Sequence, residues 1–194
     1  MTNNKIIIGV AGFIASGKGT VGEYICKKYK GEVFSSGGIL RDMVDRLHIE
    51  PTRDNLQKMS LALRDTYGPD ILSQTLAKEV LLSKKSVIAI EGLRRPSDVD
   101  ALRVMPNFHL FAVEAPIRTR WQRMRLRRQK SDDAKKTFKE FLRDSAAEAE
   151  QQIADISKQA ELTLDNGGSF EKLFKQIDEA IKKIQYERKN KKSR

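Results

Sequence analysis

Apolar and polar positions follow two patterns along the chain. Short, nearly continuous apolar runs are typical of strands buried on both faces of a sheet, whereas apolar residues that recur every three or four positions indicate amphipathic helices. The first pattern predicts strands over 5–10, 32–35, 86–90, 108–113 and 162–164. The second predicts helices over 20–29, 39–47, 51–67, a stretch after Gly68-Pro69 that ends near Leu82, 98–105, a stretch from Ile117, one or two helices within 135–159, and a terminal helix from Phe170 to about Ile184.

Strands and helices alternate from one end of the chain to the other. This order predicts an α/β fold, a three-layer sandwich with a mostly parallel five-stranded sheet. Ligands of such sheets bind at the carboxyl ends of the strands, where the glycine-rich and charged turns of this chain lie. At 194 residues we expect one domain, residues 1–185, followed by a polar, basic and frayed tail, residues 186–194.

Composition narrows the class of protein. Hydrophobic residues make up 39% of the chain and charged residues 32%, and no run approaches the roughly 20 apolar residues of a membrane span. A membrane protein is therefore excluded. The single cysteine, Cys26, excludes an intramolecular disulfide framework and is typical of a reducing compartment, so we expect a cytoplasmic protein.

The formal net charge of +11 predicts an anionic partner. The excess is concentrated in two segments: residues 117–130 carry a net charge of +7 and residues 182–194 a net charge of +6, which leaves −2 on the rest of the chain. The body is nearly neutral, so the charge indicates local phosphate chemistry more than a surface that binds nucleic acid throughout.

Residues 12–18, GFIASGK, have the GxxxxGK spacing of a P-loop and lie between a predicted strand and a predicted helix. Glycines let the backbone curl so that successive N–H groups face one centre, and the following helix adds positive potential at its N-terminus. The Lys18 ammonium would reach the β- and γ-phosphates. The motif therefore predicts nucleotide binding, with the candidate residues Gly12, Ala15, Ser16, Gly17, Lys18, Gly19 and Thr20.

The residue after Lys18 is Gly19, and a hydroxyl, that of Thr20, comes one position later. In P-loop NTPases the hydroxyl that binds magnesium directly follows the lysine, and no Asn-Lys-x-Asp guanine signature occurs, so a GTPase or a motor is disfavoured. The form GKGT resembles adenylate kinases and other nucleoside monophosphate kinases. This resemblance implies a single P-loop kinase domain over 1–185 with the cofactors ATP and Mg²⁺, the metal being held mostly by phosphates and water, with Thr20 as a candidate ligand.

Two more segments resemble the acceptor-binding parts of these kinases: SSGGILR at 35–41 and EGLRR at 91–95, the latter similar to the Asp-Gly-Phe-Pro-Arg turn of adenylate kinases. The resemblance implies that Glu91 holds the water shell of magnesium. It also implies that arginines bind the acceptor phosphate, since a guanidinium matches phosphate oxygens bidentately. The implied substrate-binding residues are Ser36, Gly37, Arg41, Arg94 and Arg95. Acceptor-binding helices are expected over about 38–84.

Seven basic residues and no acid occur from Ile117 to Lys130. Charges this dense repel one another unless an anion neutralises them, and the transferring phosphoryl group is such an anion. Arg120, Arg123 and Arg127 recur at helical spacing, so one face of the helix is expected to direct them at phosphates.

A lid over about 117–145 resembles the short lid of UMP/CMP kinases, although Lys130, ahead of Ser131-Asp132-Asp133, stands where those enzymes have an arginine. Arg143 matches a lid arginine of an archaeal P-loop kinase family. With Lys18, the implied catalytic residues are Arg123, Arg127 and Arg143. Asn166-Gly167-Gly168 resembles the loop that carries the ATP adenine, which makes Gly167 a cofactor-binding candidate.

The leading hypothesis is an ATP-dependent phosphotransferase acting on a nucleoside or deoxynucleoside monophosphate, a small-molecule partner. A dephospho-CoA kinase-like enzyme is the alternative within the same class. Its acceptor is a ribose hydroxyl, which requires a carboxylate base after the second strand, and this chain has Gly38 near that position. A nucleic-acid-associated P-loop ATPase is the alternative from another class, because the basic tail would give weak non-specific nucleic acid binding. We expect a monomer or homodimer.

Overall fold

A computed structural model describes residues 5–127, 133–146 and 148–192. Its five strands form one sheet: β1 (Ile6–Ala11), β2 (Glu32–Ser35), β3 (Val87–Glu91), β4 (Phe108–Glu114) and β5 (Leu162–Asp165). Their order is β2-β3-β1-β4-β5, and every neighbouring pair is parallel. The predicted α/β sandwich is confirmed, and the described sheet is parallel throughout.

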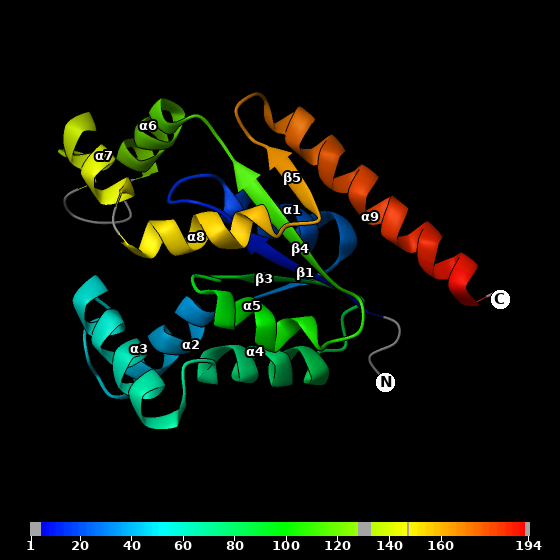
Figure 1. The fold of residues 1–194 in the computed structure, drawn as a ribbon, viewed down its shortest axis with the longest axis horizontal. Coiled ribbons are helices and arrows are strands. Elements are labelled where there is room, and N and C mark those ends of the chain that lie inside the picture. The colour runs from blue at the N-terminus through cyan, green and yellow to red at the C-terminus, as the bar shows by residue number, and fades with distance from the viewer. Residues whose placement is uncertain (1–4, 128–132, 147, 193–194) are drawn as a thin grey trace.

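The described helices are α1 (Lys18–Tyr29), α2 (Ser36–Arg46), α3 (Arg53–Tyr67), α4 (Ile71–Leu82), α5 (Pro96–Arg103), α6 (Ile117–Arg127), α7 (Phe138–Ser145), α8 (Glu148–Lys158) and α9 (Phe170–Lys192). One face of the sheet packs against α1 and α9, and the other against α4, α5 and α8. Helices α2 and α3 form a group at one end of the sheet, and α6 and α7 form another (Figure 1).

Apolar side chains fill the space on both faces of the sheet. In β1, alternate residues go to opposite sides: Ile6 and Ile8 join Ile25 and Ile177 under α1 and α9, while Ile7 packs beneath α4, α5 and α8. A parallel strand buried on both faces needs apolar residues at successive positions, which is why the short continuous runs of the sequence mark these strands.

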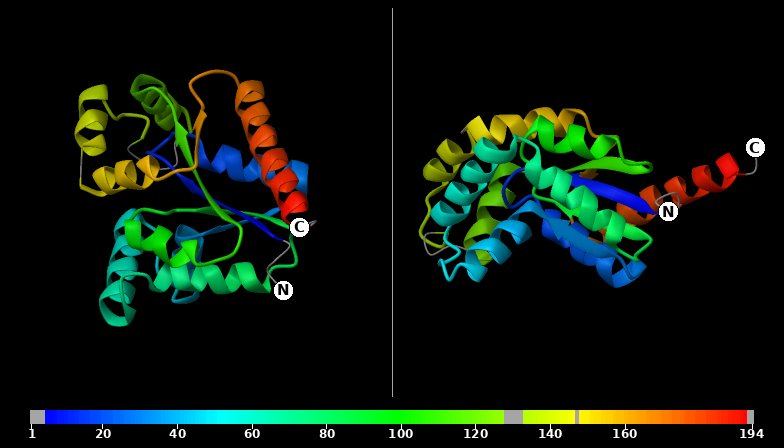
Figure 2. Two further views of the ribbon diagram at one scale, coloured as in Figure 1. Left: turned by 45° about the vertical axis from the view of Figure 1, so that its right-hand side comes forward. Right: turned by 90° about the horizontal axis from the view of Figure 1, so that it is seen from below.

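The last helix differs from the prediction. A frayed segment was expected after Gln185, but α9 continues to Lys192. Its last turns extend past the rest of the molecule (Figure 1, Figure 2). The apolar periodicity ends at Ile184, yet Lys, Arg and Glu are good helix formers, so the helix continues without an apolar face to bury.

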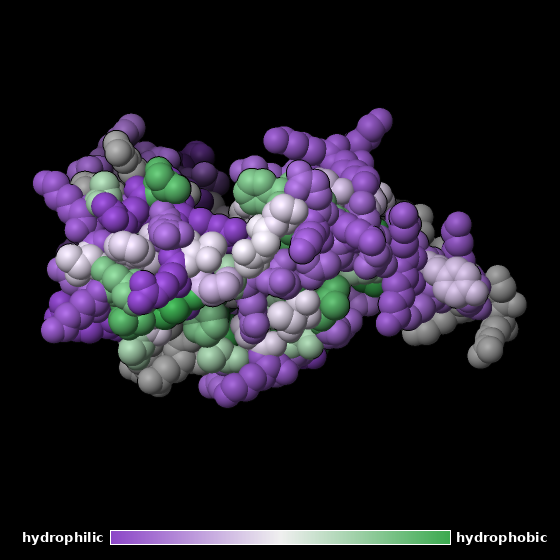
Figure 3. Space-filling view, turned by 90° about the horizontal axis from the view of Figure 1, so that it is seen from above, coloured by the Kyte–Doolittle hydropathy of each residue, from purple (hydrophilic) through white to green (hydrophobic). Residues whose placement is uncertain are grey.

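No helix in residues 5–127, 133–146 and 148–192 is long and apolar enough to cross a membrane. The face seen from above is mostly hydrophilic, with apolar side chains in small separate groups (Figure 3).

Candidate functional site

The loop between β1 and α1 has the backbone that the P-loop motif requires. Gly12 and Gly17 have φ angles of 150° and 109°, and Ala15, although not glycine, has φ of 59°. These values lie in the left-handed region that favours glycine. A side chain on Gly17 would overlap the Asn166 amide, and one on Gly12 would lie 2.6 Å from the Val113 carbonyl oxygen. Both glycines are therefore required by space as well as by backbone angle.

Two buried side chains hold this loop from below. The Asn166 amide donates to the Ser16 carbonyl at 2.7 Å, and the Arg120 guanidinium lies 4.9 Å from the centre of the Phe13 ring and contacts the Ile14 carbonyl at 3.4 Å. The sequence did not identify Asn166, although the turn that it opens was noted. Arg120 was expected to face phosphates together with its helical neighbours, whereas 93% of it is buried against the loop and the lid helix α7.

The Lys18 ammonium donates to the carbonyl oxygens of Gly12 and Phe13, at 2.7 and 2.9 Å. The positive charge of Lys18 therefore lies beside the backbone of Gly12 and Phe13, at the start of the loop. Ser16 is buried and Thr20 is half-buried. Gly19 is exposed, and no atom of the described residues lies within 4 Å of the position that a side chain there would take. The predicted nucleotide-binding residues thus form one continuous loop and helix start with open space beside it.

Glu91 ends β3 next to this loop. A methyl group on Gly22 of α1 would overlap the Glu91 carboxylate, so the helix passes directly against it. Burial raises the pKa of the Glu91 carboxyl, and the nearby Lys18 ammonium opposes that rise. Glu91 also lines a shallow hollow of about 340 Å³ beside α1, together with Gly19, Glu23, Cys26, Lys27 and Val33.

Within the part of the chain that the structure describes, no group of three or more His, Cys, Asp or Glu side chains could enclose a metal ion. The carboxylate at the end of β3 and the Thr20 hydroxyl of α1 are the candidate donors. Mg²⁺ is usually held by one or two carboxylates together with substrate phosphates and water. One carboxylate near a phosphate loop therefore fits a hydrated magnesium ion and does not fit a metal held by protein alone.

The two acceptor-type segments of the sequence meet in space. The Ser36 hydroxyl, at the start of α2, donates to the Gly92 carbonyl at 2.9 Å. Gly92 has φ of 81°, and a side chain there would lie 2.5 Å from that hydroxyl. Gly37 faces the Arg41 guanidinium, which would be 3.6 Å from a methyl group on Gly37. The residues predicted to surround the acceptor thus come from both segments.

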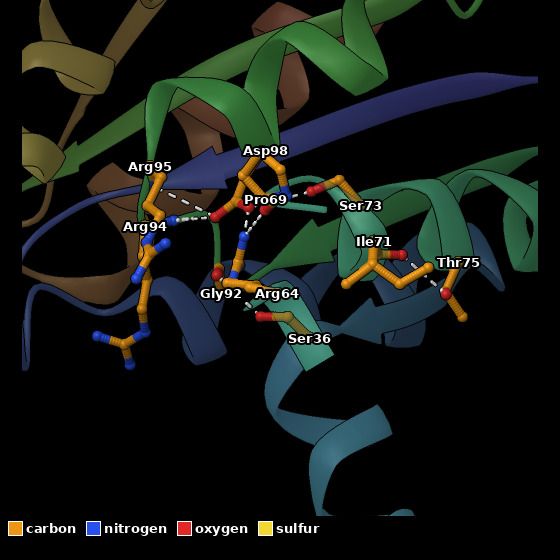
Figure 4. Close-up of polar contacts among 10 residues, drawn as sticks. All are labelled: Ser36, Arg64, Pro69, Ile71, Ser73, Thr75, Gly92, Arg94, Arg95 and Asp98. Atoms are coloured by element: carbon orange, nitrogen blue, oxygen red, sulfur yellow. Dashed lines mark hydrogen bonds and ion pairs between the residues drawn. The ribbon is translucent and has the colours of Figure 1, made fainter. Parts of the chain in front are cut away.

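Arg94 and Arg95 follow in the same turn, with exposed side chains. Their backbone N–H groups donate to one oxygen of the Asp98 carboxylate, at 2.9 and 3.1 Å. The other oxygen forms a buried ion pair with Arg64 of α3, at 2.9 Å. The arginine side chains extend away from this carboxylate (Figure 4). The sequence singled out neither Arg64 nor Asp98, because no local pattern marks their contact across 34 positions.

The lid residues have different surroundings. Arg123 of α6 is partly buried, and its buried Nη1 atom has no hydrogen-bond partner within 5–127, 133–146 and 148–192. Arg127 and Arg143 are exposed. Gly167 lies at the surface against Pro116. The predictions for Lys130, Ser131 and Asp132 concern positions outside the described residues.

The parallel sheet with the order β2-β3-β1-β4-β5, the phosphate loop after β1 and the carboxylate at the end of β3 define the class of P-loop kinase-like proteins. A family model described as an AAA domain matches residues 11–142. A UPF0200 protein of Pyrococcus abyssi is 33% identical over 186 residues, covering 93% of this chain and 98% of the relative. The chain belongs to the UPF0200 family. Another member, from Methanothermobacter thermautotrophicus, is 27% identical and covers 93% of this chain and 92% of its own length.

Solved structures support the same fold. Shikimate kinase from Bacteroides thetaiotaomicron superposes with a TM-score of 0.62 at 15% identity, covering 93% of this chain and 98% of that one. TT1252 from Thermus thermophilus superposes with a TM-score of 0.61 at 20% identity, covering 95% and 98%. At these identities the likeness concerns the fold alone.

Proposed function

We propose that this protein transfers the γ-phosphate of ATP to a nucleoside or deoxynucleoside monophosphate. The observation that carries the proposal is the placement of a phosphate loop, one carboxylate and three arginine-bearing segments at the carboxyl ends of parallel strands. The loop follows β1 and Glu91 ends β3, while the arginines lie in α2 after β2, in the turn after β3 and in α6 after β4. Phosphoryl transfer relies almost entirely on positioning and charge stabilisation, so a site of this composition suits it.

On the donor side, Lys18 and the amides of residues 12–20 bind the triphosphate, and Gly167 borders the adenine. Glu91, through water, and the Thr20 hydroxyl would hold Mg²⁺. When bound, the metal would supply positive charge that neutralises the charge of the phosphates. Burial raises the pKa of the Glu91 carboxyl, and a cation bound nearby would favour its ionised form.

On the acceptor side, Arg41, Arg94 and Arg95 bind the acceptor phosphate, and the Ser36–Gly37 turn borders the rest of the nucleotide. An oxygen of the acceptor phosphate attacks the γ-phosphorus, the bond to the ADP oxygen breaks, and a nucleoside diphosphate and ADP leave. The attacking oxygen is already anionic and needs no general base. The absence of a carboxylate from residues 35–38, SSGG, agrees with such an acceptor and disfavours the ribose hydroxyl of dephospho-CoA.

The lid contributes Arg123, Arg127 and Arg143 to the transferring group. The buried Nη1 of Arg123, which has no hydrogen-bond partner among the described residues, supports this role, because a buried donor without a partner costs free energy that a bound anion would restore.

The test is a panel of ribo- and deoxyribonucleoside monophosphates, with dephospho-CoA and shikimate, incubated with ATP and Mg²⁺ while ADP release and labelled products are measured. We expect a diphosphate product from at least one monophosphate. Lys18→Ala should abolish this product. Lys78→Ala, which replaces an exposed lysine of α4, should not. Product from dephospho-CoA or shikimate alone, or none from any acceptor while ATP still binds, would overturn the proposal.

A second role concerns the projecting end of α9. Residues 182–194 carry a net charge of +6, and the last described turns of α9, up to Lys192, extend past the body (Figure 2). This arrangement suits non-specific contact with nucleic acid phosphates. Deleting residues 186–194 should abolish salt-dependent RNA binding and leave kinase activity intact. Unchanged RNA binding by the shortened protein would exclude this role.

A further inference from the structure

One buried carboxylate joins three parts of the proposed acceptor site. Asp98, in the first turn of α5, is 2% exposed. One of its oxygens accepts hydrogen bonds from the backbone N–H groups of Arg94 and Arg95. The other accepts hydrogen bonds from the Arg64 guanidinium of α3, at 2.9 Å, and from the Ser73 hydroxyl of α4, at 3.2 Å (Figure 4).

Arg64 extends the same connection. It is 7% exposed and also donates to the Pro69 carbonyl, in the link between α3 and α4. A buried pair of charges is costly to desolvate, and replacing both partners by apolar side chains often leaves stability unchanged or improved. Stability alone therefore does not account for an arginine and an aspartate at these two positions.

The Asp98 contacts act on the turn that carries Arg94 and Arg95. At its start, this turn is tied to α2 through the Ser36 hydroxyl and the Gly92 carbonyl. At its end, both arginine N–H groups are fixed by Asp98. The backbone from which these exposed guanidinium groups extend is thus fixed to α2, α3 and α4 at once.

We propose that Asp98 and Arg64 are positioning residues for the acceptor phosphate. Their ion pair fixes the conformation of the turn that carries Arg94 and Arg95, and it holds this turn against the α3–α4 junction. This inference rests on the proposed function for its kinetic consequence. Its structural content, the restraint of the turn by Asp98, is measurable without any acceptor.

The kinetic test uses a double variant, Arg64→Leu with Asp98→Leu, which removes both buried charges and the acceptor of the two backbone N–H groups. Ser73→Ala is the matched control, because it removes only the longest of the four contacts to Asp98. The best monophosphate from the acceptor panel is the varied substrate. We expect the double variant to raise the acceptor KM about 10- to 100-fold, the effect of losing one charge-assisted hydrogen bond, and to leave the KM for ATP unchanged. The control should keep both values near those of the wild type.

A folded double variant whose acceptor KM equals that of the wild type would overturn the inference, and so would equal rises in both KM values, since a purely structural defect is not specific for the acceptor.

The second test does not depend on activity. Amide hydrogen exchange measured by NMR should show protected Arg94 and Arg95 N–H groups in the wild type, and faster exchange in Asp98→Asn, in which a neutral amide replaces the carboxylate. Unprotected amides in the wild type would overturn the inference even if the double variant does not fold. If the amides behave as expected but no acceptor is phosphorylated, the proposed function fails and the restraint of the turn stands.

Discussion

Two glycines of α1 provide a matched test of how closely this helix passes the Glu91 carboxylate. A methyl group on Gly19 would have no described atom within 4 Å, whereas one on Gly22 would overlap the Glu91 carboxylate and lie 3.0 Å from Val33 Cγ2. Both positions lie in the same helix, so the gain in helix propensity from alanine is similar, up to about 1 kcal/mol. The two variants therefore differ mainly in the space around the added methyl group.

Overpacking a filled site costs about 1–3 kcal/mol. We expect Gly19→Ala to raise the free energy of unfolding by up to about 1 kcal/mol, and Gly22→Ala to lie about 1–3 kcal/mol below it. Urea unfolding followed by circular dichroism measures both values, and equal slopes against urea would show that the change is one of stability.

A double-mutant cycle assigns the cost to one contact. In a Glu91→Ala background the carboxylate is absent, so Gly22→Ala should recover most of its deficit, with a coupling energy of about 1–2 kcal/mol. Equal stabilisation by Gly19→Ala and Gly22→Ala would refute the close approach of the carboxylate to α1. A deficit that persists without the carboxylate would assign the contact to Val33 instead.

Three further outcomes are expected. Burial raises the pKa of Glu91 above its value in the unfolded chain. The folded state therefore binds this proton more tightly than the unfolded state, and the protein gains stability as the pH falls through the folded pKa. Glu91→Gln, which removes the charge, should raise Tm at pH 7 and raise it much less at pH 4. Asn166→Ala removes the donor to the Ser16 carbonyl and should weaken ATP binding about 5- to 100-fold by calorimetry, as loss of a buried hydrogen bond implies; unchanged affinity would mean that the loop needs no support there. Arg120→Met should lower the free energy of unfolding by about 1–2 kcal/mol through loss of the cation–π contact with Phe13, and equal stability would contradict that contact.

The phosphate loop and the acceptor segments were predicted from the sequence because their signals are local. The spacing of Gly12, Gly17 and Lys18 after an apolar run is a property of consecutive residues, and the structure gives both glycines the φ angles that this spacing implies. The strands were equally evident, since burial on both faces requires uninterrupted apolar residues. Local spacing of this kind needs no knowledge of distant parts of the chain.

The supports of the site were not predictable in this way. Asn166 lies 150 positions from the carbonyl that it holds, and Asp98 lies 34 positions from Arg64. In the sequence these are ordinary polar residues in a turn and in helices. Their burial results from the way in which separate helices meet at the carboxyl ends of the strands.

Arg120 shows the limit of helical spacing. The recurrence of Arg120, Arg123 and Arg127 correctly placed them on one helix, α6, and spacing alone put them toward one ligand. The neighbours of each turn of the helix differ, however: Arg120 packs between Phe13 and Phe141, whereas Arg127 is exposed. Helical periodicity shows which side chains point to the same side of a helix, but it does not show which residues or ligands lie on that side.

The sequence by itself determined the class of fold and the phosphate loop, because apolar periodicity and glycine spacing act over a few residues. Only the tertiary structure decided which residues support the loop and the turn. Asn166 and Arg120 contact the backbone of the phosphate loop, and Asp98, paired with Arg64, contacts the backbone of the turn that carries Arg94 and Arg95. The physical reason is that a buried polar group needs a partner, and in this protein the partners are brought together by helices and strands that are far apart in the chain.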